Sequence, residues 1–422
     1  MIHEVFTMKV ICAAVQLEAY DPLIFQHELD ELADLAHSLN YEIVDTVIQK
    51  ARSWDPVGYF RKGKIEEIKM LIQTLDAEAL LLNDEISPAI EEYLSRTLDT
   101  MIIDRTFLIL ETFKERSQTR VSQLQVEMAL LTYQLPRLGQ MKIQGDRSGG
   151  GIGAKGSGET ALDLKKDLAI KRILRLRKEL AECTQSRATA RKSQSDHGLY
   201  KVALAGYTNA GKSTLMNALL DYTQAKGKEV VAKDQLFCTL ETKTRHLAYN
   251  HHEFLLTDTV GFLQKLPHSL IDAFHSTLEE ITEADLILLV ADATDPFYQK
   301  GIETSLNVLN HLGIKDIPII YVFTKIDKLN GDFYIPPLYN EAIAISSLNR
   351  LNFEHLLDMI IQHMDEGFQE WSGLLPYGSK EIDQIKSIGS IKFIEKCDDG
   401  LWIDALVPES YLEHLASLAR HH

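Results

Sequence analysis

Apolar and polar residues follow two rhythms along the chain, and these predict an ordered series of helices and strands. Residues 25–39 have the three-and-four spacing of an amphipathic helix, and residues 41–48 alternate as a strand does. Further helices are predicted over 64–75 and 87–98, and further strands over 79–82 and 100–104. This repeated order predicts an open α/β domain over residues 1–110.

The next stretch has the pattern of two helices that pack along each other. One apolar seam, with steps of three and four residues, consists of Val121, Leu124, Met128, Leu131 and Leu135. A second seam consists of Ala169, Ile173, Leu176, Leu180 and Cys183. Because a connector separates the seams, an antiparallel helical hairpin is predicted over residues 111–196. Residues 186–196 are polar, have no apolar period, and are expected to form a hinge.

The connector of this hairpin, residues 139–158, contains eight glycines and is expected to be exposed. It belongs to a basic stretch with 14 Lys and Arg against 6 Asp and Glu between Arg137 and Lys192, in a chain of formal net charge −17. Any contact with a polyanion is therefore predicted there. Charged helix faces are also often simply solvated, so the residues alone leave both interpretations open.

The second half alternates strand and helix. Strands are predicted over 200–205, 253–257, 285–291, 317–323 and 342–345. With helical stretches between most of them, this order predicts a doubly wound, mostly parallel sheet over residues 197–365, closed by a helix at 352–363. Residues 371–380 are expected to be a turn-rich linker. Alternation over 387–407 and a helix at 409–420 then predict a small α+β domain within 366–422.

Composition places the chain among globular proteins. Of its 422 residues, 45% are hydrophobic and 25% charged, and this length predicts several domains. No apolar run is long enough to span a bilayer, and the start of the chain lacks the features of a signal peptide, so a cytoplasmic location is expected. The four cysteines are widely scattered, which favours reduced thiols over disulfides or a zinc site.

One stretch carries recognisable chemistry. Residues 206–214, Gly-Tyr-Thr-Asn-Ala-Gly-Lys-Ser-Thr, match the phosphate-binding pattern G-x-x-x-x-G-K-[ST] between a predicted strand and a predicted helix. The predicted nucleotide-binding residues are Gly206, Tyr207, Thr208, Asn209, Ala210, Gly211, Lys212, Ser213 and Thr214. The Lys212 ammonium would reach the β- and γ-phosphates, and the Ser213 hydroxyl would ligate Mg²⁺.

A second motif, Asp258-Thr-Val-Gly261, follows the next predicted strand. Asp258 is expected to link to Mg²⁺, and the Gly261 N–H to sense the γ-phosphate. The polar, turn-rich residues 223–245 predict a switch loop whose Thr239 would cap Mg²⁺ when γ-phosphate is present. The predicted catalytic residues are Lys212, Thr239 and Gly261, and the predicted Mg²⁺ ligands are Ser213, Thr239 and Asp258.

Phe262 follows this motif, at a position where many such enzymes carry a glutamine that orients the attacking water. A phenyl ring cannot orient a nucleophile, so slow intrinsic hydrolysis is expected, with the missing group supplied by a partner or another residue. Phe262 is equally interpreted as an apolar anchor of the switch, and the two interpretations are compatible.

Base selection is predicted from Thr324-Lys-Ile-Asp327. The Asp327 carboxylate is suited to accept hydrogen bonds from guanine N1–H and the 2-amino group, a donor pair that adenine lacks, which predicts a GTPase. Lys325 would lie along the base, and backbone N–H groups of Ser346 and Ser347 would contact guanine O6. Thr324 stands where asparagine is commoner, which is expected to cost one supporting hydrogen bond.

Several motifs act together to indicate a family. They are residues 206–215, Phe237-Cys-Thr-Leu240, Asp258-Thr-Val-Gly-Phe262, Tyr59-Phe-Arg-Lys-Gly-Lys64, residues 103–110, Leu124-Gln-Val-Glu127, Leu135-Pro-Arg-Leu138 and residues 149–160. Together they resemble the HflX GTPases. The resemblance implies a GTP hydrolase that uses GTP/GDP and Mg²⁺, binds the large ribosomal subunit, and splits stalled or idle ribosomes under stress. It also implies that Gly139 to Lys192 contact ribosomal RNA.

Three functions remain open at this point. The first is the ribosome-splitting GTPase, and the second is a GTP-binding regulatory module that acts through protein partners. The third is ATP-dependent RNA remodelling by the amino-terminal domain, in which the residues show no adenine site. We expect a monomer that does not bind DNA and has at most a peripheral association with membranes. Steep salt dependence would mark RNA binding and separate the first two functions.

Overall fold

The computed structural model describes residues 8–138, 157–193, 199–223, 243–250, 252–263, 265, 281–409, 411–412 and 414–415. By their internal contacts these residues fall into two units, which are described separately. The first comprises residues 8–138, the helix from Ser157 up to Ser186, and residues 263 and 265, and the second comprises the rest. Among the described helices none is long and apolar enough to cross a membrane.

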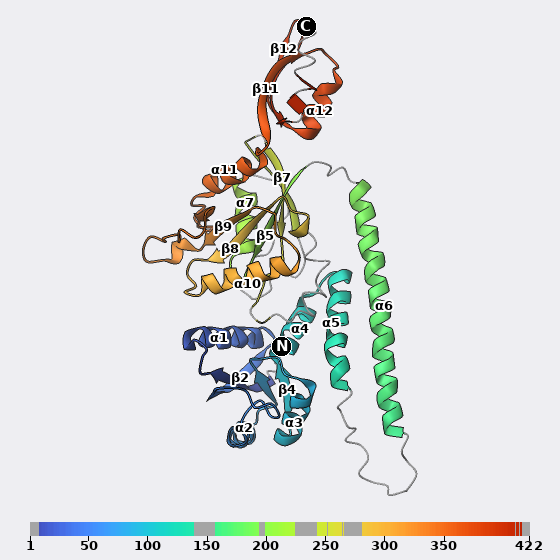
Figure 1. Ribbon diagram of the computed structural model, residues 1–422, viewed down its shortest axis with the longest axis vertical. Helices are drawn as coiled ribbons and strands as arrows, with labels where there is room; N and C mark the ends of the chain where they lie inside the picture. Colours follow the sequence, from blue (N-terminus) through green and yellow to red (C-terminus); the bar gives the residue numbers. More distant parts are fainter. Residues whose placement is uncertain are drawn as a thin grey trace, which may run out of the picture. The chain divides into compact units, whose positions relative to one another are not determined.

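The first unit is built on a parallel four-stranded sheet. Its strands are β1 (Met8–Leu17), β2 (Tyr41–Ala51), β3 (Ala79–Leu82) and β4 (Met101–Asp104), in the order β2-β1-β3-β4. The helices are α1 (Pro22–Ser38), α2 (Lys62–Leu75), α3 (Pro88–Leu98) and α4 (Arg105–Arg116). Figure 1 shows them around the sheet. The predicted open α/β fold is confirmed.

The sequence prediction omits β1, although this strand lies inside the sheet. Val10, Ile11, Ala13 and Ala14 are all fully buried. A parallel strand covered on both faces has no polar side to alternate with. The alternation used to identify strands is therefore absent from the strand that contributes most to this core.

Two helices of this unit begin at sequence signals that fix their first turn. Asp21 accepts a hydrogen bond of 2.8 Å from the Leu23 N–H, and Pro22 is the first residue of α1. Ser87 caps α3 in the same way, ahead of Pro88. A side-chain acceptor followed by proline satisfies one N–H and removes another, which favours a helix start.

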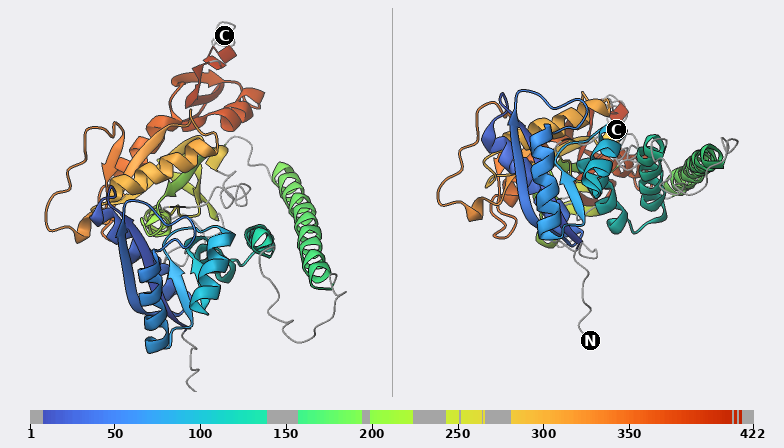
Figure 2. Two further views of the ribbon diagram at one scale, coloured as in Figure 1. Left: turned by 60° about the horizontal axis from the view of Figure 1, so that its bottom comes forward. Right: turned by 90° about the horizontal axis from the view of Figure 1, so that it is seen from below.

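The predicted helical hairpin is present. Helices α5 (Arg120–Leu138) and α6 (Ser157–Ser193) lie side by side in Figures 1 and 2. Arg120 contacts Glu179 at 2.6 Å, and Arg172 binds Glu127 with two hydrogen bonds of 2.7 and 2.8 Å. Because residue numbers rise in one helix as they fall in the other, the helices are antiparallel. Helix α6 continues to Ser193, through part of the predicted hinge, while the boundary between the two units falls after Ser186, so the hinge stays a prediction.

The apolar seam predicted for α6 agrees better with the observed burial of side chains than the seam predicted for α5. Ala169, Ile173 and Leu176 of α6 are buried. In α5, however, Met128 is only half-buried, whereas Gln125 is fully buried. Helix α5 packs against α4 as well as α6, so it has two contact faces, and a single seam does not describe it.

The second unit contains a six-stranded sheet. Its strands are β5 (Tyr200–Gly206), β6 (Lys243–Tyr249), β7 (His252–Asp258), β8 (Leu286–Asp292), β9 (Ile319–Thr324) and β10 (Ala342–Ala344), in the order β10-β9-β8-β5-β7-β6. All neighbours are parallel except β6 and β7. The helices are α7 (Lys212–Tyr222), α10 (Tyr298–His311), the short 3₁₀ helix η1 (Ile326–Lys328) and α11 (Phe353–Met364). The predicted doubly wound sheet is confirmed, and β6 is a strand that the prediction omits.

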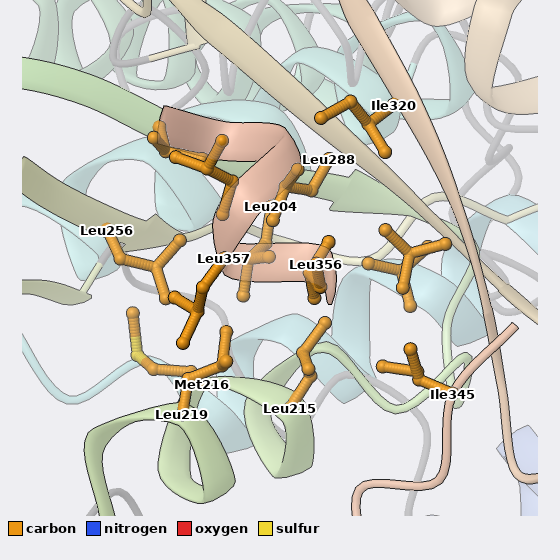
Figure 3. Packing of buried hydrophobic residues seen from close by; sticks show 14 of the residues in the cluster. Leu204, Leu215, Met216, Leu219, Leu256, Leu288, Ile320, Ile345, Leu356 and Leu357 are labelled. Atoms are coloured by element: carbon orange, nitrogen blue, oxygen red, sulfur yellow. The ribbon is translucent and has the colours of Figure 1, made fainter. Parts of the chain in front are cut away.

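The core of this sheet supports the nucleotide loop. Figure 3 shows Leu215 and Leu219 of α7 close to Leu356 and Leu357 of α11, next to strand residues such as Leu204. All five are completely buried. Removing such side chains from water contributes about 1.5–3 kcal/mol each. The helix that begins at Lys212 is thereby fixed on the sheet.

A three-stranded antiparallel sheet follows in the second unit. Strands β11 (Phe368–Leu375), β12 (Ser390–Cys397) and β13 (Gly400–Pro408) pair in the order β11-β13-β12, with helix α12 (Lys380–Ile388). The small α+β fold is confirmed, but the linker predicted over 371–380 is partly wrong because β11 extends to Leu375. Edge strand β11 contains Gly373 and is followed by Pro376, residues typical of turns. The division into domains 1–110, 111–196, 197–365 and 366–422 stays a prediction.

Candidate nucleotide-binding site

The candidate site lies at the carboxyl end of β5. This strand is flanked by β7 on one side and β8 on the other, so connections leave it in both directions. In doubly wound sheets a ligand binds at this topological switch point, beyond the strand ends. The loop from Gly206 to Gly211 begins there and leads directly into α7.

The loop conformation requires its two glycines. Gly206 has φ +144°, and a Cβ there would lie 2.2 Å from the carbonyl oxygen of Val290. Gly211, with φ +92°, precedes the first residue of α7. Asn209 also has positive φ, 58°. Both glycines adopt conformations that L side chains rarely tolerate, and they turn the backbone tightly into the helix.

Lys212 is the first residue of α7 and is almost fully buried. Its ammonium donates hydrogen bonds to the carbonyl oxygens of Gly206 and Tyr207, at 2.9 and 2.8 Å. The charge is therefore fixed beneath the loop, at the amino terminus of α7. Positive charge at a helix amino terminus forms a binding site for phosphate groups.

Ser213 and Asp258 approach each other at the same place. The Ser213 hydroxyl donates a hydrogen bond of 2.6 Å to Asp258 Oδ2, and Asp258 is fully buried at the end of β7. A hydroxyl and a carboxylate are hard oxygen donors of the kind that Mg²⁺ prefers. The pair fits a Mg²⁺ ion bound together with nucleotide phosphates. Thr239, the third predicted ligand, lies outside the described residues.

The segment after Asp258 is tied to the loop. The Thr208 N–H donates to the Phe262 carbonyl at 2.8 Å, and the Phe262 N–H donates to the Gly206 carbonyl at 3.1 Å. A Cβ on Gly261 would lie 2.8 Å from Thr208 Cα and 3.1 Å from the Lys212 Nζ atom, so only glycine fits. Phe262 is 2% exposed. It therefore has the position of an apolar anchor.

The base-recognition residues lie at the ends of β9 and β10. The buried Ser346 hydroxyl donates 2.6 Å to Asp327 Oδ1 and accepts 3.1 Å from the Asn349 N–H. The Lys325 ammonium donates to the Asn209 carbonyl at 2.7 Å and contacts Asp292 Oδ2 at 2.8 Å. Asp327 and Lys325 are thus both held in place, as recognition of a planar base requires.

Thr324 retains a link to the phosphate-binding loop. Its hydroxyl lies 2.6 Å from the Ala210 carbonyl oxygen and 3.2 Å from the Ala291 carbonyl oxygen. The expected loss of a supporting hydrogen bond at this position is therefore offset by the threonine itself. The Ser347 hydroxyl is buried and has no protein partner among the described residues.

The structure brings together all predicted site residues that it describes, from Gly206 to Ser347. Asp292, which holds Lys325, is a residue that the motif search missed. Its position was detectable, because it ends β8, next to β5 at the carboxyl edge of the sheet. The described residues thus place a buried lysine, a hydroxyl–carboxylate pair and the candidate base-recognition residues at the carboxyl edge of one sheet.

Comparison with known families agrees with this geometry. Residues 26–114 match the family described as GTP-binding GTPase N-terminal, and residues 116–194 match the GTP-binding GTPase Middle Region. Residues 201–325 match the family described as 50S ribosome-binding GTPase. These three matches together cover most of the chain.

Individual relatives resemble it over nearly their whole length. A GTPase HflX of Caldanaerobacter subterraneus is 37% identical over 92% of this chain and 90% of its own. A GTPase HflX of Akkermansia muciniphila is 35% identical, over 93% and 92% respectively. Among solved structures, a GTP-binding protein from Sulfolobus solfataricus in complex with GDP is 24% identical, covers 84% of this chain and 98% of its own, and has a TM-score of 0.42.

A buried lysine under a glycine-shaped loop, a Ser–Asp pair and a held Asp327 occur here in a chain that matches whole relatives at more than a third identity. The nucleotide is a guanine nucleotide and the reaction is GTP hydrolysis. The chain belongs to the HflX family of GTPases.

Proposed function

We propose that this GTPase binds the large ribosomal subunit and dissociates stalled or idle ribosomes under stress, and that the ribosome stimulates its hydrolysis of GTP. The observation that carries the proposal is the distribution of charge on α6. Lys165, Lys171, Arg175, Arg177 and Lys178 are exposed, whereas the seam residues of the same helix are buried. A helix that turns a row of cations to solvent suits RNA phosphates.

The family description adds a second line of support. The relatives of residues 201–325 are described as 50S ribosome-binding GTPases. Contact with ribosomal RNA is assigned to Gly139 to Lys192, of which residues 139–156 lie outside the described residues. The protein would act as a cytoplasmic monomer.

We assign roles at the nucleotide site as follows. Lys212 and the backbone of Gly206 to Thr214 bind the phosphates, Gly261 senses the γ-phosphate, and Asp327, Lys325, Ser346 and Ser347 select guanine. Ser213 and Asp258, with Thr239, would hold Mg²⁺, which neutralises charge that develops on the phosphates. Phe262 presents no group that orients water, so turnover without ribosomes is slow.

Sucrose-gradient sedimentation of purified ribosomes with the protein and a non-hydrolysable GTP analogue tests the proposal. We expect comigration with the large subunit, loss of whole ribosomes, and a steep fall in binding as salt rises. The double variant Arg175→Glu, Lys178→Glu should lose binding to the ribosome. Lys69→Glu, which changes an exposed side chain of α2, should retain that binding. GTP turnover that ribosomes leave unchanged would count against the proposal.

One observation favours a second candidate, a regulatory module that docks proteins through the hairpin. Leu164, Leu168 and Leu174 on α6 are 57–60% exposed. Contact through these side chains would depend weakly on salt, because burial of apolar surface carries no counterion release.

A further inference from the structure

The three-stranded sheet of β11, β13 and β12 has one face packed against α12 and a second face open to solvent. Ile403 and Ala405 of the central strand β13 are buried in one cluster with Ile385 of α12. The side chains of Trp402 and Asp404 alternate with these residues along β13, so they point to the opposite side of the sheet. Trp402 is 39% exposed. We call this second side the outer face.

The strand register identifies the other residues of the outer face. Leu374 of β11 and Glu395 of β12 both lie directly opposite Trp402, and Phe393 of β12 lies directly opposite Asp404. Directly opposite residues of an antiparallel pair have their side chains on the same face, with Cβ atoms about 4.5–5.5 Å apart. Leu374 and Phe393 are 42% and 50% exposed. The outer face therefore presents large apolar side chains at positions where a solvated sheet face carries polar ones.

An ion pair crosses one end of the outer face. Lys392 of β12 contacts Glu370 of β11 at 2.6 Å, and β13 lies between these two strands. Glu370 lies directly opposite Leu406 of β13, which is only 6% exposed. At this end the apolar side chain of the central strand is shielded from solvent. At the other end, around Trp402, the apolar side chains are accessible to a ligand.

The accessible end of the outer face is negatively charged. Asp404 and Glu395 flank Trp402 there, and neither forms an ion pair within the described part of the chain. The Trp402 indole N–H donates a hydrogen bond of 3.0 Å to Asp404 Oδ1, which holds this carboxylate beside the ring. Residues 368–408 contain seven Asp and Glu against four Lys and no Arg. Such a charge repels RNA phosphates and anionic lipid headgroups, so it favours a cationic protein segment as the ligand.

We propose that the outer face binds a basic segment of a partner protein, one that carries arginine and apolar side chains next to each other. A planar guanidinium can stack on the Trp402 ring and bind the Asp404 or Glu395 carboxylate through paired hydrogen bonds. Leu374 and Phe393 bind the apolar side chains of the segment. Exposed aromatic side chains with polar groups around them are typical of the centre of a protein interface.

Fluorescence anisotropy of labelled peptides with the full-length chain tests this assignment. The first probe is a short peptide of Arg-Arg-Leu-Leu repeats, and two comparison probes replace either its leucines by serine or its arginines by glutamate. We expect the first probe to bind at least about tenfold more tightly than the two others, because the charged and the apolar contacts both contribute. Replacement of its arginines by lysine should weaken binding less, since an ammonium keeps the charge but lacks the planar fork.

Variants of the outer face locate the binding. Trp402→Ser and Phe393→Ser should each weaken binding of the first probe at least about tenfold, the loss typical of an aromatic residue at the centre of an interface. Trp54→Ser, which changes a tryptophan of the first unit that is 46% exposed, should leave the affinity unchanged. Glu395→Lys, on edge strand β12, should also weaken binding, whereas Glu42→Lys, on edge strand β2, should not.

Equal binding of the probes, or a loss with Trp54→Ser as large as that with Trp402→Ser, would mean nonspecific attraction to an acidic chain and overturns the proposal. If Trp402→Ser does not unfold cooperatively, Phe393→Ser decides by the same measure. A second copy of this chain is the competing occupant, and a dimer in sedimentation velocity that Phe393→Ser dissociates also overturns the proposal. No measurement here includes ribosomes, so failure leaves the proposed function standing.

Discussion

The Ser346 hydroxyl donates a hydrogen bond of 2.6 Å to the Asp327 carboxylate. This bond fixes the plane of the carboxylate, and each of its oxygens keeps a lone pair that can accept from guanine N1–H or the 2-amino group. Ser346→Ala should therefore weaken GDP binding about fivefold, which corresponds to about 1 kcal/mol for one hydrogen bond. Titration with a fluorescent GDP analogue measures it. Ser305→Ala, which removes a buried hydroxyl bonded within α10, is the matched control and should leave affinity unchanged.

Replacement of Asp327 by asparagine should change which base is bound. The amide keeps one acceptor for N1–H but turns a donor toward the guanine 2-amino group, where two donors then face each other. Xanthine carries an oxygen at that position and accepts from the amide. We expect Asp327→Asn to lower the affinity for GTP by at least about tenfold and to raise the affinity for xanthosine triphosphate, both measured by competition binding. Equal loss of both nucleotides would contradict the assigned role.

Gly261→Ala should impair hydrolysis. The new methyl group would meet the Thr208 backbone at 2.8 Å, so the segment has to move off the loop. Misplacement on this scale costs roughly ten- to hundredfold in kcat, because the reacting groups lose their alignment. Gly331→Ala is the control, since nothing lies within 4 Å of its Cβ. Phosphate release under single-turnover conditions compares them, and equal rates would refute the role of Gly261.

Cys12 should resist alkylation in the native protein. It is 2% exposed in β1, and burial raises the pKa of its thiol to about 12. At pH 9 the thiolate fraction is then on the order of a thousandth, so iodoacetamide should modify it only on unfolding. Cys397, which is half-buried, is the internal control. Mass spectrometry of labelled peptides gives both rates, and labelling of Cys12 as fast as Cys397 would contradict the packing of β1.

Local pattern predicted much of this architecture, and its failures have specific causes. The phosphate-binding loop at residues 206–214 and its flanking strand and helix were predictable from residues that are contiguous in the sequence. The alternation of strands and helices in the doubly wound sheet was predictable in the same way. The sequence patterns did not predict strand β1, because it is buried on both faces and its residues do not alternate. They did not predict β11 because it is an edge strand with turn-like residues. Part of the segment predicted as a hinge, up to Ser193, is helical, because polar residues can extend a helix without breaking it.

The site shows the same division. Lys212, Ser213 and Asp258 belong to motifs with fixed spacing, so their meeting is expected. The hydrogen bond from Thr324 to Ala210 joins residues 114 positions apart, and the contact of Lys265 with Asp84 spans 181. Such pairs depend on the order of the strands in the sheet and on the paths of the loops that connect them. No periodicity in the sequence encodes them.

Helix α6 has 37 residues. At 1.5 Å per residue it is about 55 Å long, nearly twice the diameter of a small domain. A tilt of about ten degrees at one end displaces the other end by about 10 Å over that length. A small rotation at one end of α6 is therefore a large displacement at its other end, and a shorter helix would give a proportionally smaller one.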